Sequence, residues 1–383
     1  MSPVANSNLD ETPLLAQGGA ELSIVIPTFN ESANIPLIVD EIRSILGRDL
    51  NWEVVFVDDD SPDQTSGVAR QMALFDRRVR IVRRVGRRGL STAVVEGILS
   101  TSAPYVIVMD ADLQHDTSLL PRMLIELRTQ HYDVVVGSRY VDGGGMGAWE
   151  EGRQNASRLA TRIASLVVRA PVKDVMSGFF GIRRDAFDRV LPRLSNMGFK
   201  ILLDLFASSP EPLRFKEVPY TFKQRIHGDS KLDTLVLWEY LLLLFDKKFG
   251  HIIPARFVSF SVIGVSGIAV HFAVLTAMFQ VFHRGFAVAE AVAALTAMTW
   301  NFALNNMLTY RDRRLSGWGL LRGWAVFVGV CSFGAVANVG IANWLYEGKF
   351  NWAASALAGV VLGSVWNYVM SSMFSWRTTA ART

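Results

Sequence analysis

Two carboxylates separated by one residue directly follow a short apolar run. In "VIVMDADLQH" (106–115) the run ends at Asp110 and Asp112, and the amide Gln114 follows two residues later. Like charges at a strand end raise each other's pKa unless a cation lies between them. Carboxylate and amide oxygens are the ligands that Mg²⁺ and similar hard cations prefer, together with substrate phosphates. The spacing therefore predicts a divalent metal site at these three residues; capping or surface carboxylates are the alternative for the motif taken alone.

Five short apolar runs are typical of buried strands. They cover residues 22–26, 54–57, 79–85, 105–112 and 132–140, and Pro27 is expected to end the first. Apolar residues between these runs recur at helical spacing, which predicts helices near 34–42, 68–74, 90–99 and 121–129. This alternation predicts a mostly parallel α/β sheet covered on both faces.

Polar residues gather where the predicted strands end. Ligands bind parallel sheets at the carboxyl ends of the strands, so this edge is the expected site. The residues placed there are Asn30, Glu31, Asp58, Asp59, Asp60, Asp110, Asp112, Ser138 and Arg139.

The second part of the chain has the composition of a membrane domain. Of the 383 residues 50% are hydrophobic and the mean hydropathy is +0.24, too apolar for an ordinary soluble enzyme. The excess lies beyond about residue 250, in four stretches at 257–280, 286–308, 320–345 and 353–374. Each is near the ~20 residues needed to cross a bilayer. The second is the weakest, because Glu290 lies at its start and three asparagines lie near its end.

The distribution of basic residues predicts the orientation in the membrane. Lysines and arginines concentrate before the first stretch, between the second and third, and after the fourth, whereas the opposite loops hold only Arg284 and Lys349. By the positive-inside rule both termini and the α/β domain face the cytoplasm. The net charge of +4 suits an anionic membrane or phosphate substrates. We expect no nucleic-acid partner, because no basic run is interleaved with aromatics.

Several segments outside the predicted sheet carry their own expectations. Residues 1–20 are polar and small and predict a disordered tail without the pattern of a signal peptide. The glycines of 143–147 predict a mobile lid, and a helix is expected over 154–169. The apolar helix near 231–254 predicts an interfacial helix on the bilayer, with a buried soluble helix as the alternative. The single cysteine, Cys331, excludes an internal disulfide.

Six motifs occur in an order that resembles a known family. They are "IPTFNE", "VDDDSPDQT", "MDADLQH", "GSRY", "SGFFGIRR" and "RIHGDSKL". Together they resemble family 2 glycosyltransferases with a GT-A fold, and within that group the polyprenol-phosphate sugar synthases typified by dolichol-phosphate mannose synthase. The likeness covers about residues 20–240, and the four apolar stretches resemble the GtrA-like membrane domain. The expected division is a tail (1–20), a GT-A domain (21–230), an interfacial helix (231–254) and four transmembrane helices (255–376).

The resemblance implies a role for each motif on the donor side. Asp110, Asp112 and Gln114 would hold Mg²⁺ or Mn²⁺ against the donor diphosphate, and Arg225 and Lys231 would clamp the donor phosphates. The alternative for this last pair is an ordinary solvated loop. The nucleotide pocket would consist of Pro27, Thr28, Asn30, Glu31, Asp58 and Asp59, with Asp59 near the base.

The acceptor phosphate is expected to meet a second basic group. Arg139 would act as a catalytic cation there, followed by Arg153 and Ser157, which are four residues apart and hence on one helix face. The alternative is that the latter two are helix-surface residues. Asp174, Ser177 and Gly178 would line the sugar pocket or form a structural turn, and Asp204 is a possible participant near the sugar.

A few positions depart from the family's pattern. Gln64 replaces a common glycine and is expected to alter its turn, Ser91 also replaces a glycine, and Asp116 stands where proline is common. Asp60 stands where asparagine or glycine is frequent, so its role is open. None of these changes removes a predicted metal ligand.

The predicted activity is a metal-dependent, inverting transfer of a sugar to a polyprenyl or dolichyl phosphate at the cytoplasmic membrane face. Mannose from GDP-mannose is the first expectation, and glucose from UDP-glucose is the alternative. An inactive transferase domain on a lipid-sugar flippase or scaffold is the rival from another class. A processive polysaccharide synthase is disfavoured, because the sequence lacks a Gln-x-x-Arg-Trp motif. The asparagines at 301, 305, 306 and 367 are expected to face other membrane helices.

Overall fold

The computed structural model describes residues 19–145, 163–164, 167–168, 170–195, 198–222, 234–250, 252–349 and 351–377. The chain forms two compact units, Met1–Lys247 and Lys248–Thr383. Most of the expected tail, residues 146–147 of the expected lid and most of the helix expected over 154–169 lie outside the described residues.

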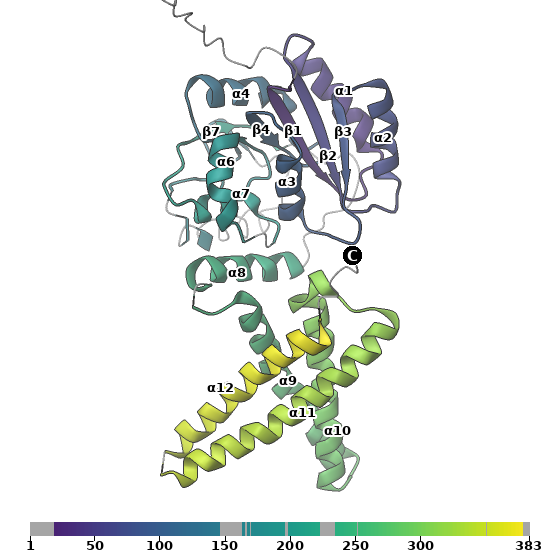
Figure 1. Cartoon of the computed structure of the whole chain (residues 1–383), viewed down its shortest axis with the longest axis vertical. Coiled ribbons are helices and arrows are strands. Elements are labelled where there is room, and N and C mark those ends of the chain that lie inside the picture. Colours follow the sequence, from purple (N-terminus) through teal and green to yellow (C-terminus); the bar gives the residue numbers. More distant parts are fainter. Residues whose placement is uncertain are drawn as a thin grey trace, which may run out of the picture. The chain divides into compact units, whose positions relative to one another are not determined.

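The first unit contains a seven-stranded sheet in the order β3-β2-β1-β4-β6-β5-β7 (Figure 1). Every pairing is parallel except those of β6, which runs antiparallel to β4 and β5. The five predicted strands and the mostly parallel sheet are confirmed. The strands are β1 (Leu22–Thr28), β2 (Trp52–Asp58), β3 (Val79–Arg83), β4 (Tyr105–Val108), β5 (Val134–Ser138), β6 (Phe180–Arg183) and β7 (Phe215–Pro219).

Helices cover both faces of this sheet (Figure 1). Alternate residues of one strand point to opposite faces, so Ile24 and Ile26 enter one core while Val25 enters the other. The first core packs on α1, α2 and α4, and the second on α3, α6, α7 and α8. The helices are α1 (Asn34–Leu46), α2 (Thr65–Phe75), α3 (Leu90–Leu99), α4 (Leu120–Thr129), α6 (Arg184–Val190), α7 (Ile201–Ser208) and α8 (Thr234–Phe249).

The sequence predicted that Pro27 ends β1, and this prediction is wrong. The strand continues to Thr28, because Pro27 pairs with Val57 of β2 and Thr28 pairs with Asp58. On the other side, the pairing of β1 with β4 already stops at Val25. A proline lacks the N–H that a strand with two neighbours needs, and here one of those neighbours has ended.

Helix α8 packs one face on the first unit and exposes apolar residues on another. Tyr240, Leu243 and Leu244 are buried in the second core, whereas Leu237 and Leu241 are exposed. A helix with an exposed apolar face is compatible with the predicted position on a bilayer, which stays a prediction.

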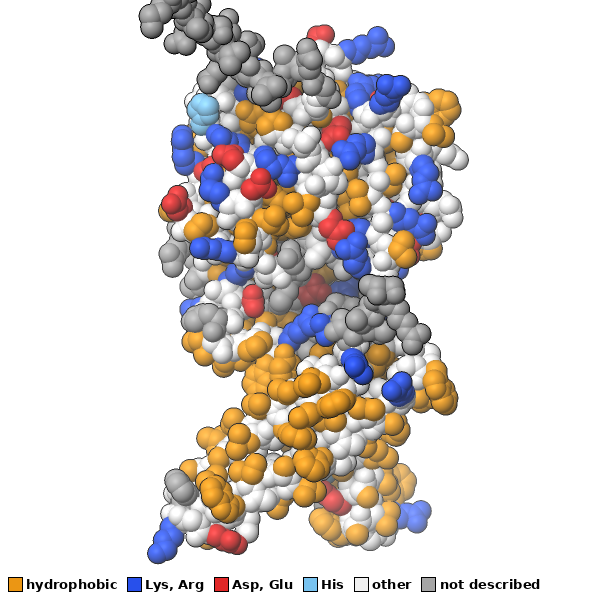
Figure 2. Space-filling view, in the orientation of Figure 1, with side chains coloured by type: hydrophobic (Ala, Val, Ile, Leu, Met, Phe, Trp, Pro, Cys, Tyr) orange, Lys and Arg blue, Asp and Glu red, His pale blue; other side chains and the backbone are white. Residues whose placement is uncertain are grey.

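The second unit consists of helices long and apolar enough to span a membrane. They are α9 (Ala255–Thr276), α10 (Phe286–Leu304), α11 (Gly317–Glu347) and α12 (Trp352–Met370), and π-helical turns extend three of them at 277–281, 305–309 and 371–375. The span-length segments are Ala255–Val281, Phe286–Thr309, Gly317–Glu347 and Leu357–Ser375, which confirms the four predicted stretches. Hydrophobic side chains dominate the visible surface of these helices (Figure 2).

These helices contain an internal repeat that the sequence reading missed. The segment "WNFALNNMLTYR" (300–311) at the end of α10 returns as "WNYVMSSMFSWR" (366–377) at the end of α12, 66 residues later (366 − 300). Both segments contain a π-helical turn at the same place. The aromatic residues that follow these turns, Tyr310 and Trp376, stack at 4.2 Å with an interplanar angle of 6°. The membrane unit is therefore built as two related helical hairpins, α9–α10 and α11–α12.

Each hairpin packs an asparagine of its second helix against a glycine of its first. A Cβ on Gly267 would lie 2.3 Å from Oδ1 of Asn301, and a Cβ on Gly334 would lie 2.1 Å from Oδ1 of Asn367. Polar groups are costly in lipid, and small residues allow helices to approach closely. These two asparagines therefore face a neighbouring helix, as predicted.

We predict that Gly334→Ala lowers the melting temperature of the detergent-solubilised protein, because the new methyl group collides with the Asn367 amide. Overpacking of this kind costs about 1–3 kcal/mol. Gly267→Ala, at the equivalent place in the first hairpin, is expected to do the same. Gly329→Ala is the control, since a Cβ there meets no atom within 4 Å. Equal melting temperatures for the three variants and the native protein would contradict the packing described here.

Candidate active site

Asp58, at the end of β2, is fully buried and organises the turn that follows it. One carboxylate oxygen accepts hydrogen bonds from Ser61 and from the Thr28 hydroxyl, the latter at 3.4 Å. The other accepts hydrogen bonds from the Ser66 hydroxyl and the Ser61 amide. Asp58 thus shapes the predicted nucleotide pocket through internal contacts.

Side chains of the turn after β2 accept hydrogen bonds from the loop after β1. The backbone amide of Asn30 donates to Ser61 at 2.9 Å and that of Glu31 donates to Thr65 at 3.0 Å. Asn34 also donates to the Glu31 carboxylate at 2.7 Å. The structure therefore brings Pro27, Thr28, Asn30, Glu31 and Asp58 together along the carboxyl edge of β1 and β2.

Gln64 adopts the left-handed conformation for which glycine is usual. Its φ is +67° and its ψ is +20°. The turn therefore has a conformation that glycine adopts at less cost than glutamine. The carboxylate of Asp63, beside Gln64, accepts hydrogen bonds from the amide and the hydroxyl of Thr65 and so holds the same turn.

Asp59 is paired with a buried arginine that the sequence reading did not identify. The guanidinium of Arg84 is 2.7 Å from the Asp59 carboxylate, and the amide of Gly89 donates to the same carboxylate at 2.7 Å. Burial raises the pKa of Asp59, although the Gly89 amide and the Arg84 charge oppose this shift. Arg84 also donates a hydrogen bond to the hydroxyl of Thr92 at 2.6 Å, so it connects Asp59, the residue predicted to lie near the base, to the start of α3.

Asp110 lies two residues beyond the end of β4, beside a buried histidine. Nε2 of His115 is 3.2 Å from Asp110 Oδ2, and Nδ1 of the same ring is 3.2 Å from the hydroxyl of Tyr220. The ring of His115 also packs on Phe179 and Phe222. This histidine is the last residue of "MDADLQH", so its place in the motif was the available signal for a role that the sequence reading did not assign.

The charges around Asp110 keep it ionised. Burial raises its pKa, but the hydrogen bond and charge of His115, with the charges of Lys200 and Arg139, outweigh burial and leave the pKa below its usual value. Burial and the nearby Arg139 in turn lower the pKa of Lys200. Lys200, at the start of α7, was also absent from the predicted site, because a lysine 90 residues away (200 − 110) carries no sequence signal of proximity.

The second carboxylate and the amide of the motif lie in the same short segment. Asp112 and Gln114 are buried, and the backbone amide of Gln114 donates to Asp112 Oδ1 at 3.2 Å. Gly178 lies against the Asp110 side chain, because a Cβ on Gly178 would be 2.7 Å from Oδ2 of Asp110. Gly178 therefore shapes the space that the Asp110 carboxylate occupies.

The residues of this motif fit a hard divalent cation that the substrate helps to coordinate. Among the described residues, no three His, Cys, Asp or Glu side chains are placed to hold a metal ion by themselves. Mg²⁺ usually takes one or two carboxylates and completes its shell with water and substrate phosphates. Two carboxylates one residue apart in the sequence, one of them with a lowered pKa, meet that requirement.

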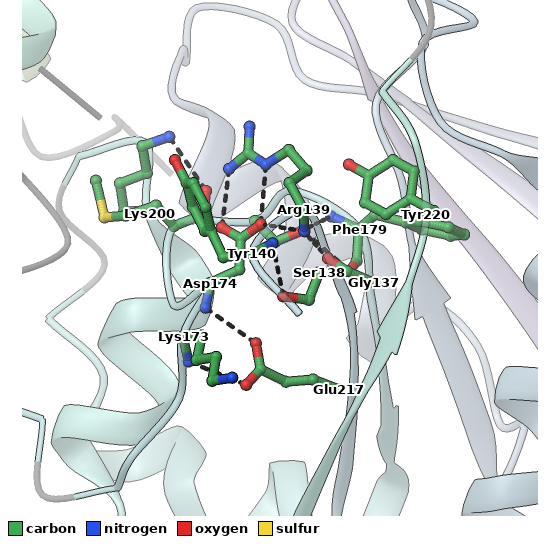
Figure 3. Close-up of polar contacts among 12 residues, drawn as sticks. Gly137, Ser138, Arg139, Tyr140, Lys173, Asp174, Phe179, Lys200, Glu217 and Tyr220 are labelled. Carbon is green, nitrogen blue, oxygen red and sulfur yellow. Dashed lines mark hydrogen bonds and ion pairs between the residues drawn. The ribbon is translucent and has the colours of Figure 1, made fainter. Parts of the chain in front are cut away.

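Arg139 is held by a two-pronged ion pair with Asp174 (Figure 3). Its Nε and Nη2 each lie 2.8 Å from an oxygen of the fully buried Asp174 carboxylate, and its backbone amide donates to the same group at 3.0 Å. The backbone amides of Lys173 and Asp174 donate to Glu217 of β7 at 3.0 Å (Figure 3). Burial lowers the pKa of the Arg139 guanidinium, but the hydrogen bonds and charge of Asp174 outweigh burial and raise it.

Two of the remaining candidates have internal roles in the described structure. Ser177 donates to the carbonyl of Gly137 at 2.7 Å and accepts a hydrogen bond from the amide of Phe179 at 3.1 Å, contacts that are compatible with the structural turn given as its alternative. Asp204 pairs with Lys247 of α8 at 2.6 Å and accepts hydrogen bonds from Ser195 and Ser208, so its carboxylate ties α7 to α8.

Four predicted site residues cannot be placed against this geometry. Arg153, Ser157, Arg225 and Lys231 lie outside the described residues. Their assignment to acceptor and donor phosphates stays a prediction.

The chain is similar to known proteins along its whole length. Residues 23–191 match Glycosyl transferase family 2, and residues 259–376 match the GtrA/DPMS transmembrane domain. The dolichol-phosphate mannosyltransferase of Pyrococcus furiosus is 34% identical over 375 residues, which cover 94% of this chain and 100% of that protein. This chain belongs to the dolichol-phosphate mannosyltransferase family. It is a membrane glycosyltransferase, as the motifs had indicated.

Other relatives match a smaller share of the chain. The dolichol-phosphate mannosyltransferase of Saccharomyces cerevisiae is 34% identical over 229 residues, which cover 58% of this chain and 84% of the yeast protein. A crystal structure of glucosyl-3-phosphoglycerate synthase from Mycobacterium tuberculosis, with Mn²⁺, UDP and glucosyl-3-phosphoglycerate, is 20% identical with a TM-score of 0.45. It covers 60% of this chain and 80% of its own.

We predict that Gly178→Ala lowers glycosyl transfer at least about tenfold while the melting temperature stays nearly unchanged. The added methyl group displaces the end of a movable side chain, Asp110, and small displacements in an active site cost about a hundredfold in rate. Gly97→Ala is the contrasting variant, because its Cβ would lie 2.4 Å from Val25 in the core and is expected to lower stability. Full activity of Gly178→Ala would show that the Asp110 position does not matter for transfer.

Proposed function

We propose that this protein transfers mannose from GDP-mannose to the phosphate of a polyprenyl or dolichyl phosphate, with a divalent metal ion and inversion at the sugar carbon. The observation that carries the proposal is the pair Asp110 and Asp112 just beyond the end of β4. The pKa of Asp110 is lowered by His115, which lies 3.2 Å away, and by the charges of Lys200 and Arg139. The choice of mannose is supported by the names of the relatives, including the one that spans the chain.

On the donor side, Asp110, Asp112 and Gln114 would hold Mg²⁺ or Mn²⁺. The ion would supply Lewis-acid stabilisation of the departing nucleoside diphosphate. The hydrogen-bonded loops after β1 and β2 would hold the nucleoside, with Asp59 near the base and fixed by Arg84. Arg225 and Lys231 would add positive charge at the diphosphate.

On the acceptor side, the chemistry requires positive charge more than it requires a base. The nucleophile is a phosphate oxygen, and a phosphate monoester with a second pKa near 6 is largely dianionic at neutral pH. The obstacle is repulsion between this dianion and the donor diphosphate. Arg139, already oriented by Asp174, would offset that repulsion together with Arg153 and Ser157.

The proposed place of the reaction is the cytoplasmic face of the membrane. Arginines lie at one end of the spanning helices, at 256, between α10 and α11, and at 377, whereas Arg284 and Lys349 are alone at the other end. The positive-inside rule assigns the arginine-rich end to the cytoplasm. Both termini would then be cytoplasmic.

One other donor remains an alternative to be tested, and one other role is opposed by the site. UDP-glucose is the alternative donor, because base selection rests on the shape of the nucleotide pocket and the motifs do not separate the two bases. A flippase or scaffold with an inactive transferase unit is opposed by the intact Asp110, Asp112 and Arg139.

We predict that the purified protein transfers labelled mannose from GDP-mannose into a polyprenyl-phosphate lipid phase, and that EDTA abolishes transfer until Mg²⁺ or Mn²⁺ is added. Asp112→Asn is expected to lower the rate at least about a hundredfold, because it removes a charged metal ligand. Asp188→Asn, an exposed aspartate on α6, is the matched control. Label entering from UDP-glucose alone would change the assigned donor, and transfer that survives both EDTA and Asp112→Asn would overturn the metal mechanism.

A further inference from the structure

A basic pocket lies at the edge of the sheet opposite the active site. It has a volume of about 630 Å³ and is formed where α1 and α2, which lie side by side (Figure 1), end. Arg48 lies shortly before β2 and Arg78 directly before β3, so the pocket is at the amino edge of these strands. Four arginines and one aspartate line it, together with Phe75: Arg43, Arg48, Asp76, Arg77 and Arg78.

The cationic side chains of this pocket are partly fixed in place. Asp76 holds Arg43 at 3.1 Å and Arg78 at 2.8 Å. The guanidinium of Arg78 also lies 4.4 Å from the centre of the Trp52 ring. Asp76 and Asp40, which pairs with Arg43 at 2.7 Å, offset two of the four arginine charges, so the pocket keeps an excess of positive charge that favours an acidic ligand.

The rim of the pocket is unusually apolar for a soluble surface. Phe75 is 92% exposed and Leu74 is 78% exposed, more than any other large hydrophobic side chain described in the first unit. Exposed apolar residues beside a group of charged residues are typical of a surface that binds another segment or protein. A matching ligand combines acidic residues with apolar ones.

The N-terminal segment of this chain has that composition and starts beside the pocket. Residues 9–15 read "LDETPLL", with two adjacent acidic residues followed by two leucines. The carbonyl of Gly19 accepts a hydrogen bond from Asn51 at 2.6 Å, and Asn51 is three residues from Arg48. The ten residues from Leu9 to Gly19 can extend about 35 Å, which is enough to reach the far side of such a pocket.

We propose that residues 9–15 dock in this pocket of the same molecule, with Asp10 and Glu11 on its arginines and the leucines on Phe75 and Leu74. The tail would cover the exposed apolar rim of α2. Because the pocket is at the edge opposite the active site, docking leaves glycosyl transfer unchanged, and the proposal stands or falls independently of the proposed reaction.

The test uses disulfide trapping in the full-length protein. The single native cysteine is first replaced (Cys331→Ala), and Thr12→Cys is combined with Met72→Cys, which lines the pocket and leaves all its arginines in place. Gln130→Cys is the matched control: it is exposed and follows α4, whose Arg128 pairs with Glu21 near the same root of the tail. Mild oxidation is expected to give an intramolecular disulfide to position 72 and several-fold less to position 130.

Charge reversal distinguishes docking from chance collision. The double change Asp10→Lys and Glu11→Lys is expected to lower the yield at position 72 about tenfold, the combined effect of two lost ion pairs and new like-charge repulsion. Equal yields at 72 and 130, or a yield that charge reversal does not change, would overturn the proposal. A disulfide found only between two molecules would also overturn it and assign the pocket to the tail of a second copy.

Discussion

The concentration of negative charge at the carboxyl edge of the sheet is the constraint on which the site depends. Asp58, Asp59, Asp110, Asp112 and Asp174 all lie within a few residues of that edge. Carboxylates brought this close destabilise one another unless each is given hydrogen bonds or a counter-charge. The protein meets this requirement differently at each position, and the differences separate structural from functional carboxylates.

Asp58 and Asp174 are satisfied within the protein. Asp58 is surrounded by hydroxyl and amide donors, and Asp174 carries a two-pronged arginine. Asp110 is different, because its side chain is 37% exposed and its neighbours His115, Lys200 and Arg139 lower its pKa. A partly exposed carboxylate held in the ionised form at a strand end is suited to a cationic ligand. Arg139 is kept oriented by its partner Asp174, whose backbone amide donates a hydrogen bond to the Glu217 carboxylate.

Local sequence patterns predicted the parts of this fold that depend on local physics. The five apolar runs formed strands, and the four long apolar stretches formed helices of spanning length, because burial and bilayer thickness act on contiguous segments. The strands β6 ("FGIR") and β7 ("FKEVP") were missed, because they are short and contain charged residues. The same limit applies to the site. Asp110 and Asp112 were visible as a motif. Arg84, which pairs with Asp59, and Lys200, which acts on Asp110, come from other segments, and only tertiary contacts reveal that they belong to the site.

The membrane unit shows why a repeat can escape a reading based on hydropathy. Lipid-facing positions need only be apolar, so equivalent helices can diverge there at little cost, and hydropathy alone does not reveal the repeat. The constraint lies at the helix contacts, where an asparagine must find a glycine opposite it and an aromatic ring must find its counterpart. Asn301 with Gly267 and Asn367 with Gly334 obey this constraint, as do the stacked Tyr310 and Trp376. The positions that the repeat keeps therefore include those where geometry, rather than hydrophobicity, decides which residue is allowed.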